Sequence, residues 1–533
     1  RPQQRALSSR CLVDPARALY RRRVGRRLVS DQSMLRSDIF FSIALAGGAA
    51  AVRLSPRMAA AAAAPIRITP QEHSVALVAL GCPKNTVDAE VMLGDLQRHG
   101  LRVVREPENA DIVVVNTCAF VEDAKRESVA AIVDAARLKA DRSSRVRGLY
   151  VTGCMAQRYA EELADELPEV DAVVGFESYA DIPSHVLATL STSDADDTEP
   201  GLDSAAERAS VLVGAATVPF RPENDRFQLT AAHTAYLRVA EGCDHACSFC
   251  AIPGFRGAFR SKPFDTALAE ARLLVERGVR EINLIAEDTN QFGSDWGEED
   301  PRRLSHFLRE LSALPGLRWI RLLYCYPSYF SDDLVAEIAT NPKVVKYIDI
   351  PLQHLAAPTL QRMRRPGAKA TISLLERLRR EVPSLVLRTT FICGFPGESD
   401  DDHDELVRQA RRLGFERGGA FSYSAEDGTP AASMAGQVEE ETKQARKDEL
   451  VALFQEASAA WAEARVGSEL RVMVDRMDGL DAVGRTEHDA PDIDGAVRIP
   501  AMPLPPGSEV LVRVLYADVD GELVGEVVGS PPQ

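Results

Sequence analysis

Residues 241–253 read Glu241-Gly-Cys-Asp-His-Ala-Cys-Ser-Phe-Cys-Ala-Ile-Pro253, a stretch that places Cys243, Cys247 and Cys250 in one short loop. Three thiolates at this spacing can hold three corners of a 4Fe-4S cube, whereas such clusters are usually held by four cysteines. The fourth iron is then open to an atom of a substrate or cofactor. Two other interpretations stay open: a structural zinc site with His245 as the fourth ligand, and a disulfide knot.

Three more cysteines each follow an apolar run. Cys82 follows residues 75–80, Cys118 follows residues 112–115, and Cys154 follows residues 148–151. Helical patterns come next, over residues 87–99, 121–138 and 155–167. This alternation predicts a parallel, doubly wound α/β sheet, and ligands of such sheets collect at the carboxyl ends of the strands. We therefore expect the three thiols to meet at one edge, although buried cysteines can also serve as small core residues.

The surroundings of these cysteines resemble a known family. Residues 241–253, with the aromatic Phe249, resemble the cluster loop of the radical S-adenosylmethionine (SAM) enzymes. The methylthiotransferases of that superfamily carry segments similar to Leu80-Gly-Cys-Pro-Lys-Asn-Thr-Val-Asp-Ala-Glu90, Asn116-Thr-Cys-Ala-Phe120 and Thr152-Gly-Cys-Met155.

Within this family, the segment Gly-Cys-Pro-Lys-Asn is similar to the RimO branch, which modifies ribosomal protein uS12. The transfer-RNA branch, MiaB, more often reads Gly-Cys-Gln-Met-Asn. Further matches are residues 347–354, 363–365, 391–398 and 489–495, so the resemblance runs from about residue 73 to about residue 530.

The resemblance implies a reaction and its cofactors. It implies two 4Fe-4S clusters, one on Cys243, Cys247 and Cys250 and one on Cys82, Cys118 and Cys154. The first would cleave SAM to an adenosyl radical, sulfur would come from the site of the second, and a second SAM would supply the methyl group. The product would be a methylthiolated aspartate β-carbon in ribosomal protein uS12, free or in the small ribosomal subunit. Two alternatives remain: a transfer-RNA adenine methylthiotransferase of the MiaB kind, and a zinc-stabilised, non-catalytic ribosome-binding protein.

Three side chains are expected to bind the cofactor. The resemblance implies that Phe249 packs on the adenine and that Glu287 meets the methionyl amine. Arg388 lies in an apolar run that predicts a buried strand, and a buried charge must be paired or hydrogen-bonded. The carboxylate or ribose of the cofactor would satisfy Arg388, and a structural ion pair would do so equally well. Phe249 could equally be a core residue.

The chain of 533 residues divides into five predicted segments. Residues 1–71 are rich in Arg, and their apolar stretch at 39–52 is too short to span a bilayer. We interpret them as a disordered import leader or as an upstream extension of a protein that begins at Met58. Residues 72–185 form the amino-terminal cluster domain, residues 186–231 a linker, residues 232–465 the radical SAM domain, and residues 466–533 a TRAM domain.

The last two segments differ in pattern. Six strand–helix units in the radical SAM segment are too few for a closed eight-stranded barrel and resemble an open, three-quarter (β/α)6 barrel. Its strands are expected at residues 236–240, 281–285, 319–323, 347–350, 385–391 and 419–422, with helices at 265–277 and 304–313 among others. The last segment resembles the TRAM domain, a small β-barrel, with strands at residues 470–474, 496–499, 509–517 and 522–528.

The charge of the last segment and the spacing of the cysteines limit which substrates and cellular compartments are expected. Residues 466–533 hold five Arg against thirteen Asp and Glu, and such a surface repels phosphate. We therefore expect a basic protein rather than nucleic acid as the substrate, with Asp489, Asp492 and Asp494 as contact acids. The three remaining cysteines are scattered, which argues against a secreted disulfide framework. The expectation is a cytoplasmic enzyme without a membrane, or one of an organelle stroma or matrix if the leader is a transit peptide. The resemblance implies a low-potential electron donor such as flavodoxin or ferredoxin.

Overall fold

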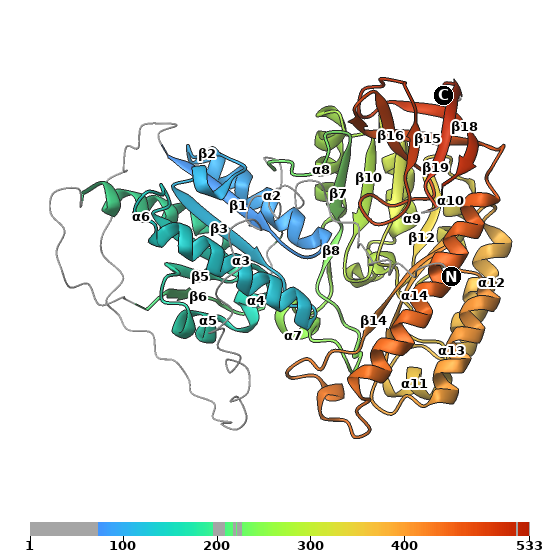
Figure 1. Cartoon of the computed structure of the whole chain (residues 1–533), viewed down its shortest axis with the longest axis horizontal. Coiled ribbons are helices and arrows are strands. Elements are labelled where there is room, and N and C mark those ends of the chain that lie inside the picture. Colours follow the sequence, from blue (N-terminus) through green and yellow to red (C-terminus); the bar gives the residue numbers. More distant parts are fainter. Residues whose placement is uncertain (1–72, 196–207, 217–219, 221–225, 519–520, 532–533) are drawn as a thin grey trace, which may run out of the picture. The chain divides into compact units, whose positions relative to one another are not determined.

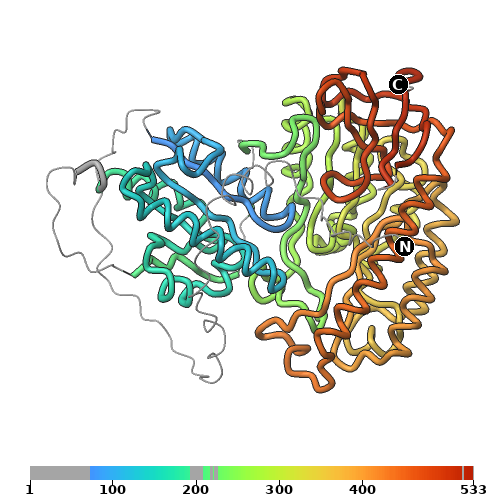
Figure 2. The backbone as a smooth tube through the Cα atoms, in the orientation of Figure 1, coloured from blue at the N-terminus to red at the C-terminus, as the bar shows by residue number. Residues whose placement is uncertain are grey.

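The computed structural model describes residues 73–195, 208–216, 220, 226–518 and 521–531, so the predicted leader at residues 1–71 lies outside the described residues. The described chain contains two six-stranded sheets, one closed five-stranded barrel and a small two-stranded sheet. Figure 2 follows the backbone through them, from blue near the amino terminus to red near the carboxyl terminus. No helix of this described part is long and apolar enough to cross a membrane.

The first sheet is parallel throughout and has the strand order β2-β1-β3-β4-β5-β6 (Figure 1). Strand β3 is completely buried and is rich in Val, as expected of a strand covered on both faces. The strands of this sheet are β1 Ser74–Ala79, β2 Arg102–Val103, β3 Ile112–Thr117, β4 Gly148–Thr152, β5 Ala172–Val174 and β6 Ser210–Leu212. The helices are α2 Pro83–Arg98, α3 Glu122–Ala140, α4 Gly153–Arg158, α5 Ala160–Glu166 and α6 Ile182–Ala195, with 3-10 turns η1 Pro107–Asn109 and η2 Phe176–Ala180. This confirms the predicted doubly wound α/β architecture. Strand β6 lies within the stretch predicted as a linker.

The second sheet is an open barrel. Its six parallel strands follow the order β14-β13-β12-β11-β10-β7, which leaves β7 and β14 as free edges. The strands are β7 Thr234–Arg238, β10 Glu281–Ile285, β11 Trp319–Leu322, β12 Val344–Asp349, β13 Val386–Cys393 and β14 Arg417–Ser422. A small antiparallel pair, β8 Ala240–Glu241 and β9 Arg260–Ser261, follows β7. The expected three-quarter barrel is thereby confirmed.

Amphipathic helices cover the outside of this barrel (Figure 1). In α9, for example, Leu304, Phe307, Leu308 and Leu311 are buried at the spacing of one helix face, against the core of the sheet. The helices that follow β9 are α8 Phe264–Glu276, α9 Leu304–Ser312, α10 Asp332–Thr340, α11 Ala357–Arg362, α12 Ala368–Glu381, α13 Asp400–Leu413 and α14 Glu440–Glu463. The short helix α7 Ile252–Arg256 packs instead against the core of the amino-terminal sheet. Three 3-10 turns, η3 Thr289–Gln291, η4 Ser294–Trp296 and η5 Pro430–Ser433, complete the domain.

The amino-terminal sheet contacts the barrel at both of its free edges. Helix α2 packs beside β7, and Val87 joins an apolar cluster with Ile285 and Leu323 of the barrel. Beyond the other edge, the loop after β14 presents Glu426, which accepts hydrogen bonds from Arg158 at 2.9 Å and from Lys125 at 3.4 Å. The open side of the barrel is therefore bridged by the first sheet.

The carboxyl-terminal barrel consists of β15 Glu469–Asp478, β16 Asp481–Thr486, β17 Val497–Ile499, β18 Glu509–Ala517 and β19 Leu523–Gly529. It is closed in the order β15-β16-β17-β19-β18, which confirms the predicted small β-barrel. The sequence pattern missed β16, whose Asp481-Ala-Val-Gly-Arg-Thr486 shows little alternation of apolar and polar residues.

This barrel packs at the amino ends of the radical SAM strands. Asp475 contacts His233, just before β7, at 2.9 Å, and Asp489 pairs with Arg417, the first residue of β14, at 2.8 Å. Asp494 accepts a hydrogen bond from the Tyr347 hydroxyl at 2.6 Å. Asp489 and Asp494 are thus buried inside the protein, and the expectation that they contact a basic substrate is wrong. Their role is to dock the small barrel.

Candidate active site

The amino-terminal cysteines lie at the carboxyl ends of three adjacent strands. Cys82 caps the start of α2 beyond β1, Cys118 follows β3, and Cys154 stands in the first turn of α4 after β4. A side chain cannot be added at Gly81, where φ is +86° and a Cβ atom would lie 2.8 Å from the Cys118 sulfur. The chain reverses its winding direction between β1 and β3, and such switch points are where doubly wound sheets bind ligands. The structure therefore brings these three thiols together.

Burial makes these thiols weak acids in the absence of a metal. It raises the pKa of Cys118 to about 12 and that of Cys154 to about 11, and in each case the neighbouring cysteines add to the rise. A bound metal must therefore displace protons from the thiols.

The second set is held by a tightly anchored loop. The Cys243 amide donates to the Gly257 carbonyl at 3.1 Å, and the Ser248 amide donates to the Met363 carbonyl at the same distance. The Ser248 hydroxyl adds a 2.7 Å bond to the Arg362 carbonyl. Burial, with the other thiols of the loop contributing, raises the pKa of both Cys243 and Cys250 to about 12. Cys243, Cys247 and Cys250 are brought together near the carboxyl end of β7.

The side-chain geometry fits a cluster better than zinc. The Nε2 atom of His245 lies 2.8 Å from Asp288, and its ring stacks on Tyr326 with centroids 3.6 Å apart. No group of three or more His, Cys, Asp or Glu among the described residues is arranged around a single ion. In a 4Fe-4S cube each thiolate binds a different iron, so the sulfurs need not converge on one point. All six cysteines are free thiols, and the residues present fit iron-sulfur clusters.

Glu287 is placed where a positively charged ligand could bind. Its side chain is 2% exposed, and neither carboxylate oxygen has a hydrogen-bond partner in the described part of the chain. Its charge acts on the thiols of both Cys243 and Cys250, so it adjoins the cluster loop. A buried carboxylate without donors is costly, and the ammonium group of SAM would relieve that cost. The observation fits the predicted role of Glu287.

The other two predicted cofactor contacts already have protein partners. Phe249 is half-buried and meets Phe395 edge to face, with ring centroids 6.5 Å apart, in a small apolar cluster beside the cysteine loop. Arg388 pairs with Asp349 at 3.0 Å and lies 3.8 Å from Asp494. The structural ion pair considered for Arg388 is therefore present. The cofactor roles of Phe249 and Arg388 remain predictions.

Sequence reasoning missed Arg256, which connects the amino-terminal cysteine set to Glu287 beside the second cysteine loop. This buried arginine in α7 donates to the Cys154 sulfur at 3.7 Å, to Asp88 at 3.0 Å and to Glu241 at 3.2 Å. Its Nε atom lies 3.8 Å from Glu287. The only signal in the sequence was its position six residues after Cys250, because its partners are up to 171 residues away.

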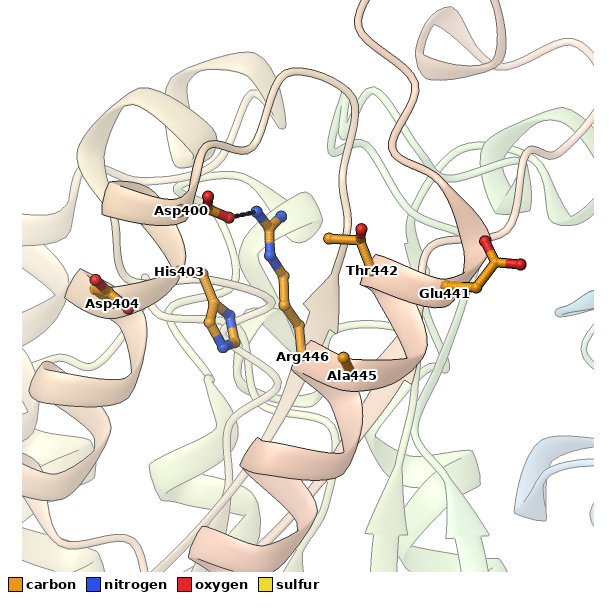
Figure 3. Close-up of a pocket in the computed structure, with 7 residues that line it drawn as sticks. All are labelled: Asp400, His403, Asp404, Glu441, Thr442, Ala445 and Arg446. Atoms are coloured by element: carbon orange, nitrogen blue, oxygen red, sulfur yellow. Dashed lines mark hydrogen bonds and ion pairs between the residues drawn. The ribbon is translucent and has the colours of Figure 1, made fainter.

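A separate surface hollow of about 390 Å³ opens between the first turns of α13 and α14 (Figure 3). None of the six cysteines lines it, and its lining consists of Asp400, His403, Asp404, Glu441, Thr442, Ala445 and Arg446. Arg446 points at Asp400, to which it donates at 2.7 Å, and His403 contacts Glu449 at 2.8 Å. Arg446 and His403 thus have partners within the protein, and none of the side chains predicted for the active site lines this hollow.

Comparison with protein families identifies each region. Residues 74–175 match the uncharacterized protein family UPF0004, residues 237–410 the radical SAM superfamily, and residues 466–528 the TRAM domain. The chain is 41% identical to a protein from Desulforamulus reducens over 460 aligned residues. The alignment covers 85% of this chain and 99% of that protein. A protein from Anaeromyxobacter sp. strain Fw109-5 is 44% identical over 467 residues, or 86% of this chain and 94% of its own length. Both are named ribosomal protein uS12 methylthiotransferase RimO. The chain belongs to the RimO family.

Membership of the RimO family confirms the resemblance seen in the sequence and does not favour the transfer-RNA or zinc alternatives. A further RimO relative, from Geobacter sulfurreducens, is 42% identical over 463 residues, covering 86% of this chain and 99% of that protein. The radical SAM region identifies an iron-sulfur cluster and SAM as its cofactors. Among solved structures, the radical SAM methyltransferase TsrM from Kitasatospora setae aligns with a TM-score of 0.46 at 15% identity, over 68% of this chain and 77% of that one. A likeness at that level adds nothing to the family assignment.

Proposed function

We propose that this protein catalyses methylthiolation of the β-carbon of an aspartate in ribosomal protein uS12, giving β-methylthioaspartate. The observation that carries the proposal is the 41–44% identity to RimO proteins over almost their whole length. The geometry is in accord, because Arg256 of the radical SAM domain contacts Cys154 of the amino-terminal set and lies 3.8 Å from Glu287, which adjoins the second cysteine loop.

We further propose that each triad holds one 4Fe-4S cluster, Cys82, Cys118 and Cys154 in one case and Cys243, Cys247 and Cys250 in the other. When bound, the clusters and SAM supply the one-electron chemistry that removes an unactivated C–H hydrogen, together with the sulfur and methyl groups that replace it. The protein contributes position, charge and the exclusion of water.

Three side chains carry these contributions. Glu287, whose carboxylate oxygens accept no hydrogen bond from the described residues and lie no nearer than 3.8 Å to Arg256, offers its negative charge to the ammonium group of SAM. Arg365 lies 3.8 Å from the Cys247 sulfur and 4.1 Å from the centre of the Tyr326 ring, so that its positive charge offsets the negative charge of a thiolate-bound cluster. Phe249 presents an apolar surface beside the cluster loop, on which the adenine of SAM can pack.

The partners follow from the same assignment. The substrate is uS12, free or within the small ribosomal subunit, and not nucleic acid. Each turnover needs electrons from a low-potential donor, and flavodoxin or ferredoxin has the required chemistry. We place the enzyme in the cytoplasm, away from any membrane, with an organelle stroma or matrix as the alternative.

The test is anaerobic reconstitution followed by mass spectrometry of purified uS12. The enzyme should hold about eight irons per chain, as two four-iron clusters require, and should add one methylthio group to a uS12 aspartate. The triple variant Cys243→Ala, Cys247→Ala, Cys250→Ala should keep about four irons and lose the activity. Zinc in place of iron would refute the cluster assignment. Modification of transfer RNA with uS12 left unchanged would refute the substrate while leaving the radical chemistry in place.

A further inference from the structure

Lys84 is a buried cation at the boundary between the two domains. It stands in the first turn of α2, two residues after Cys82, and is 7% exposed. Its ammonium group reaches the barrel, where it donates to the Ala286 carbonyl at 3.3 Å and lies 3.7 Å from the centre of the Tyr324 ring. Lys84 therefore connects the amino-terminal cysteine set to the interior of the radical SAM domain.

The two barrel residues that Lys84 meets lie at the catalytic end of the strands. Ala286 directly follows β10, and Tyr324 comes two residues after the end of β11. Tyr324 has a φ of +59°, a left-handed conformation that is uncommon for a bulky residue and is typically tolerated where function requires it. Its amide donates to Asp349, the last residue of β12, at 3.1 Å. The ammonium of Lys84 is thus held against the carboxyl ends of β10 and β11, and Asp349 of β12 anchors Tyr324 there.

The charge of Lys84 has no carboxylate partner among the described residues. Other buried cations of the site do have one: Arg256 pairs with Asp88 at 3.0 Å, Arg388 with Asp349 at 3.0 Å, and Lys262 with Glu270 at 2.7 Å. A buried charge is costly unless it is paired, and one carbonyl with an aromatic face offsets only part of that cost. The position is therefore suited to a carboxylate that comes from outside the chain.

We propose that Lys84 binds the side-chain carboxylate of the aspartate that this enzyme modifies, an inference that rests on the function proposed above. The β-carbon of an aspartate is bonded directly to its carboxylate carbon. When Lys84 holds this carboxylate, the reacting β-carbon is therefore fixed as well, since it is one bond from the carboxylate carbon. It then lies near Cys82 and faces the carboxyl ends of the barrel strands. The same contact selects aspartate over its neutral analogue asparagine.

The competing role for Lys84 is to offset the negative charge of a cluster on Cys82, Cys118 and Cys154. The two roles make different predictions. Substrate binding predicts a loss of discrimination between an acidic and a neutral substrate side chain. Charge compensation predicts a loss of bound iron.

The experiment compares Lys84→Met and Lys84→Arg with the unaltered enzyme, all reconstituted anaerobically as full chains. The probes are purified uS12 and a uS12 variant in which the modified aspartate is replaced by asparagine, with affinity measured by equilibrium binding. A hydrogen bond to a charged group contributes about 1.5–3 kcal/mol, so the unaltered enzyme should prefer the aspartate form by roughly ten- to hundredfold. Lys84→Met should reduce this ratio to about one while retaining about eight irons, and Lys84→Arg should keep part of the preference.

Lys346→Met provides the matched control. The Lys346 ammonium donates to the carbonyls of Ile338, Asn341 and Val344 and, like that of Lys84, pairs with no carboxylate of the described chain. This variant should retain the full preference for aspartate.

An unchanged preference in Lys84→Met, or a loss of about four irons from it, would overturn the proposal. If the unaltered enzyme binds uS12 without discriminating the two forms, the Lys84 proposal fails alone. If it neither binds nor modifies uS12, the proposed function fails as well.

Discussion

Arg256 donates one N–H group to the sulfur of Cys154 across 3.7 Å, although the two residues belong to different domains. The guanidinium also contacts Asp88 of α2 and Glu241 of β8, and it lies 4.5 Å from the centre of the Phe176 ring. Phe255, beside it in α7, packs into the apolar core of the amino-terminal sheet. The helix that follows the radical SAM cysteines is therefore an integral part of the interface with the other cysteine set.

Removing Arg256 should destabilise the folded protein strongly. Arg256→Ala leaves Asp88 and Glu241 in the interior with one positive partner fewer, and breaking a buried ion pair in this way costs about 3–5 kcal/mol. Arg256→Lys keeps the charge but loses the forked geometry, so its cost should be smaller. Denaturant unfolding followed by circular dichroism measures both. The exposed Arg126→Ala on α3 is the control and should change the free energy of unfolding by less than about 0.5 kcal/mol.

Replacing Glu287 by Gln should weaken the binding of SAM. The substitution keeps the shape of the side chain and removes the negative charge that would meet the ammonium group. We expect the dissociation constant to rise roughly tenfold or more, as for loss of a hydrogen bond to a charged group. Calorimetric titration of the iron-loaded enzyme with SAM measures the change, and Glu310→Gln on the exposed side of α9 is the control. Unchanged affinity in Glu287→Gln would remove Glu287 from the cofactor site.

His488 should make stability fall at acidic pH. Its imidazole is buried against Trp461, and neither ring nitrogen has a hydrogen-bond partner in the described structure. Burial lowers the pKa of His488 below its ordinary value of 6.5. The unfolded chain therefore binds a proton that the folded chain does not. This contribution to stability is fully present above pH 6.5 and is lost as the pH falls toward the lowered folded value.

His488→Phe should flatten this pH dependence. The slope of the unfolding free energy just below pH 6.5 should decrease by up to about 1.4 kcal/mol per pH unit. Denaturant unfolding at a series of pH values measures the slope. Curves at pH 8, where the imidazole is neutral in both states, correct for packing changes caused by the substitution. An equal slope in the two proteins would show that His488 accepts a proton in the folded state.

Asp489→Asn should act on stability rather than on capture of the substrate. Asp489 is 2% exposed and pairs with Arg417 at 2.8 Å, so neutralising it leaves a buried guanidinium short of its partner. We expect a loss of about 3 kcal/mol or more, measured by denaturant unfolding. Asp492→Asn, on the exposed neighbour, should change stability little. A variant Asp489→Asn that is fully stable but binds uS12 weakly would restore the substrate-facing role.

The pattern of the sequence was sufficient to predict the six strands of the open barrel and the positions of the six cysteines after strands, although it missed β2, β5, β6 and β16. Cys82, Cys118 and Cys154 each end an apolar run, and parallel strands carry such residues to one edge. The strand predicted at residues 281–285 coincides with β10 Glu281–Ile285, because its apolar residues stand between a clear helix before it and a loop after it.

Contacts between distant segments could not be predicted in this way. Nothing near Lys84 in the sequence indicates that its ammonium would meet Ala286, 202 residues further on. Asp489 and Asp494 read as surface acids because charge alone does not reveal a partner, and Arg417 and Tyr347 lie in another domain. The contacts between domains, and with them Arg256, emerge only in the folded structure.

The burial of the amino-terminal thiols bears on how this enzyme is loaded with metal. With α2 along β7 and Glu426 bound to Arg158, Cys118 and Cys154 expose only 6% and 8% of their surface, whereas Cys82 is partly exposed. A carrier protein that delivers iron and sulfide to the folded chain therefore meets Cys82 and finds the other two thiols covered. We expect loading to be faster before the folded arrangement is complete, and an interface strengthened beyond its natural level to slow it.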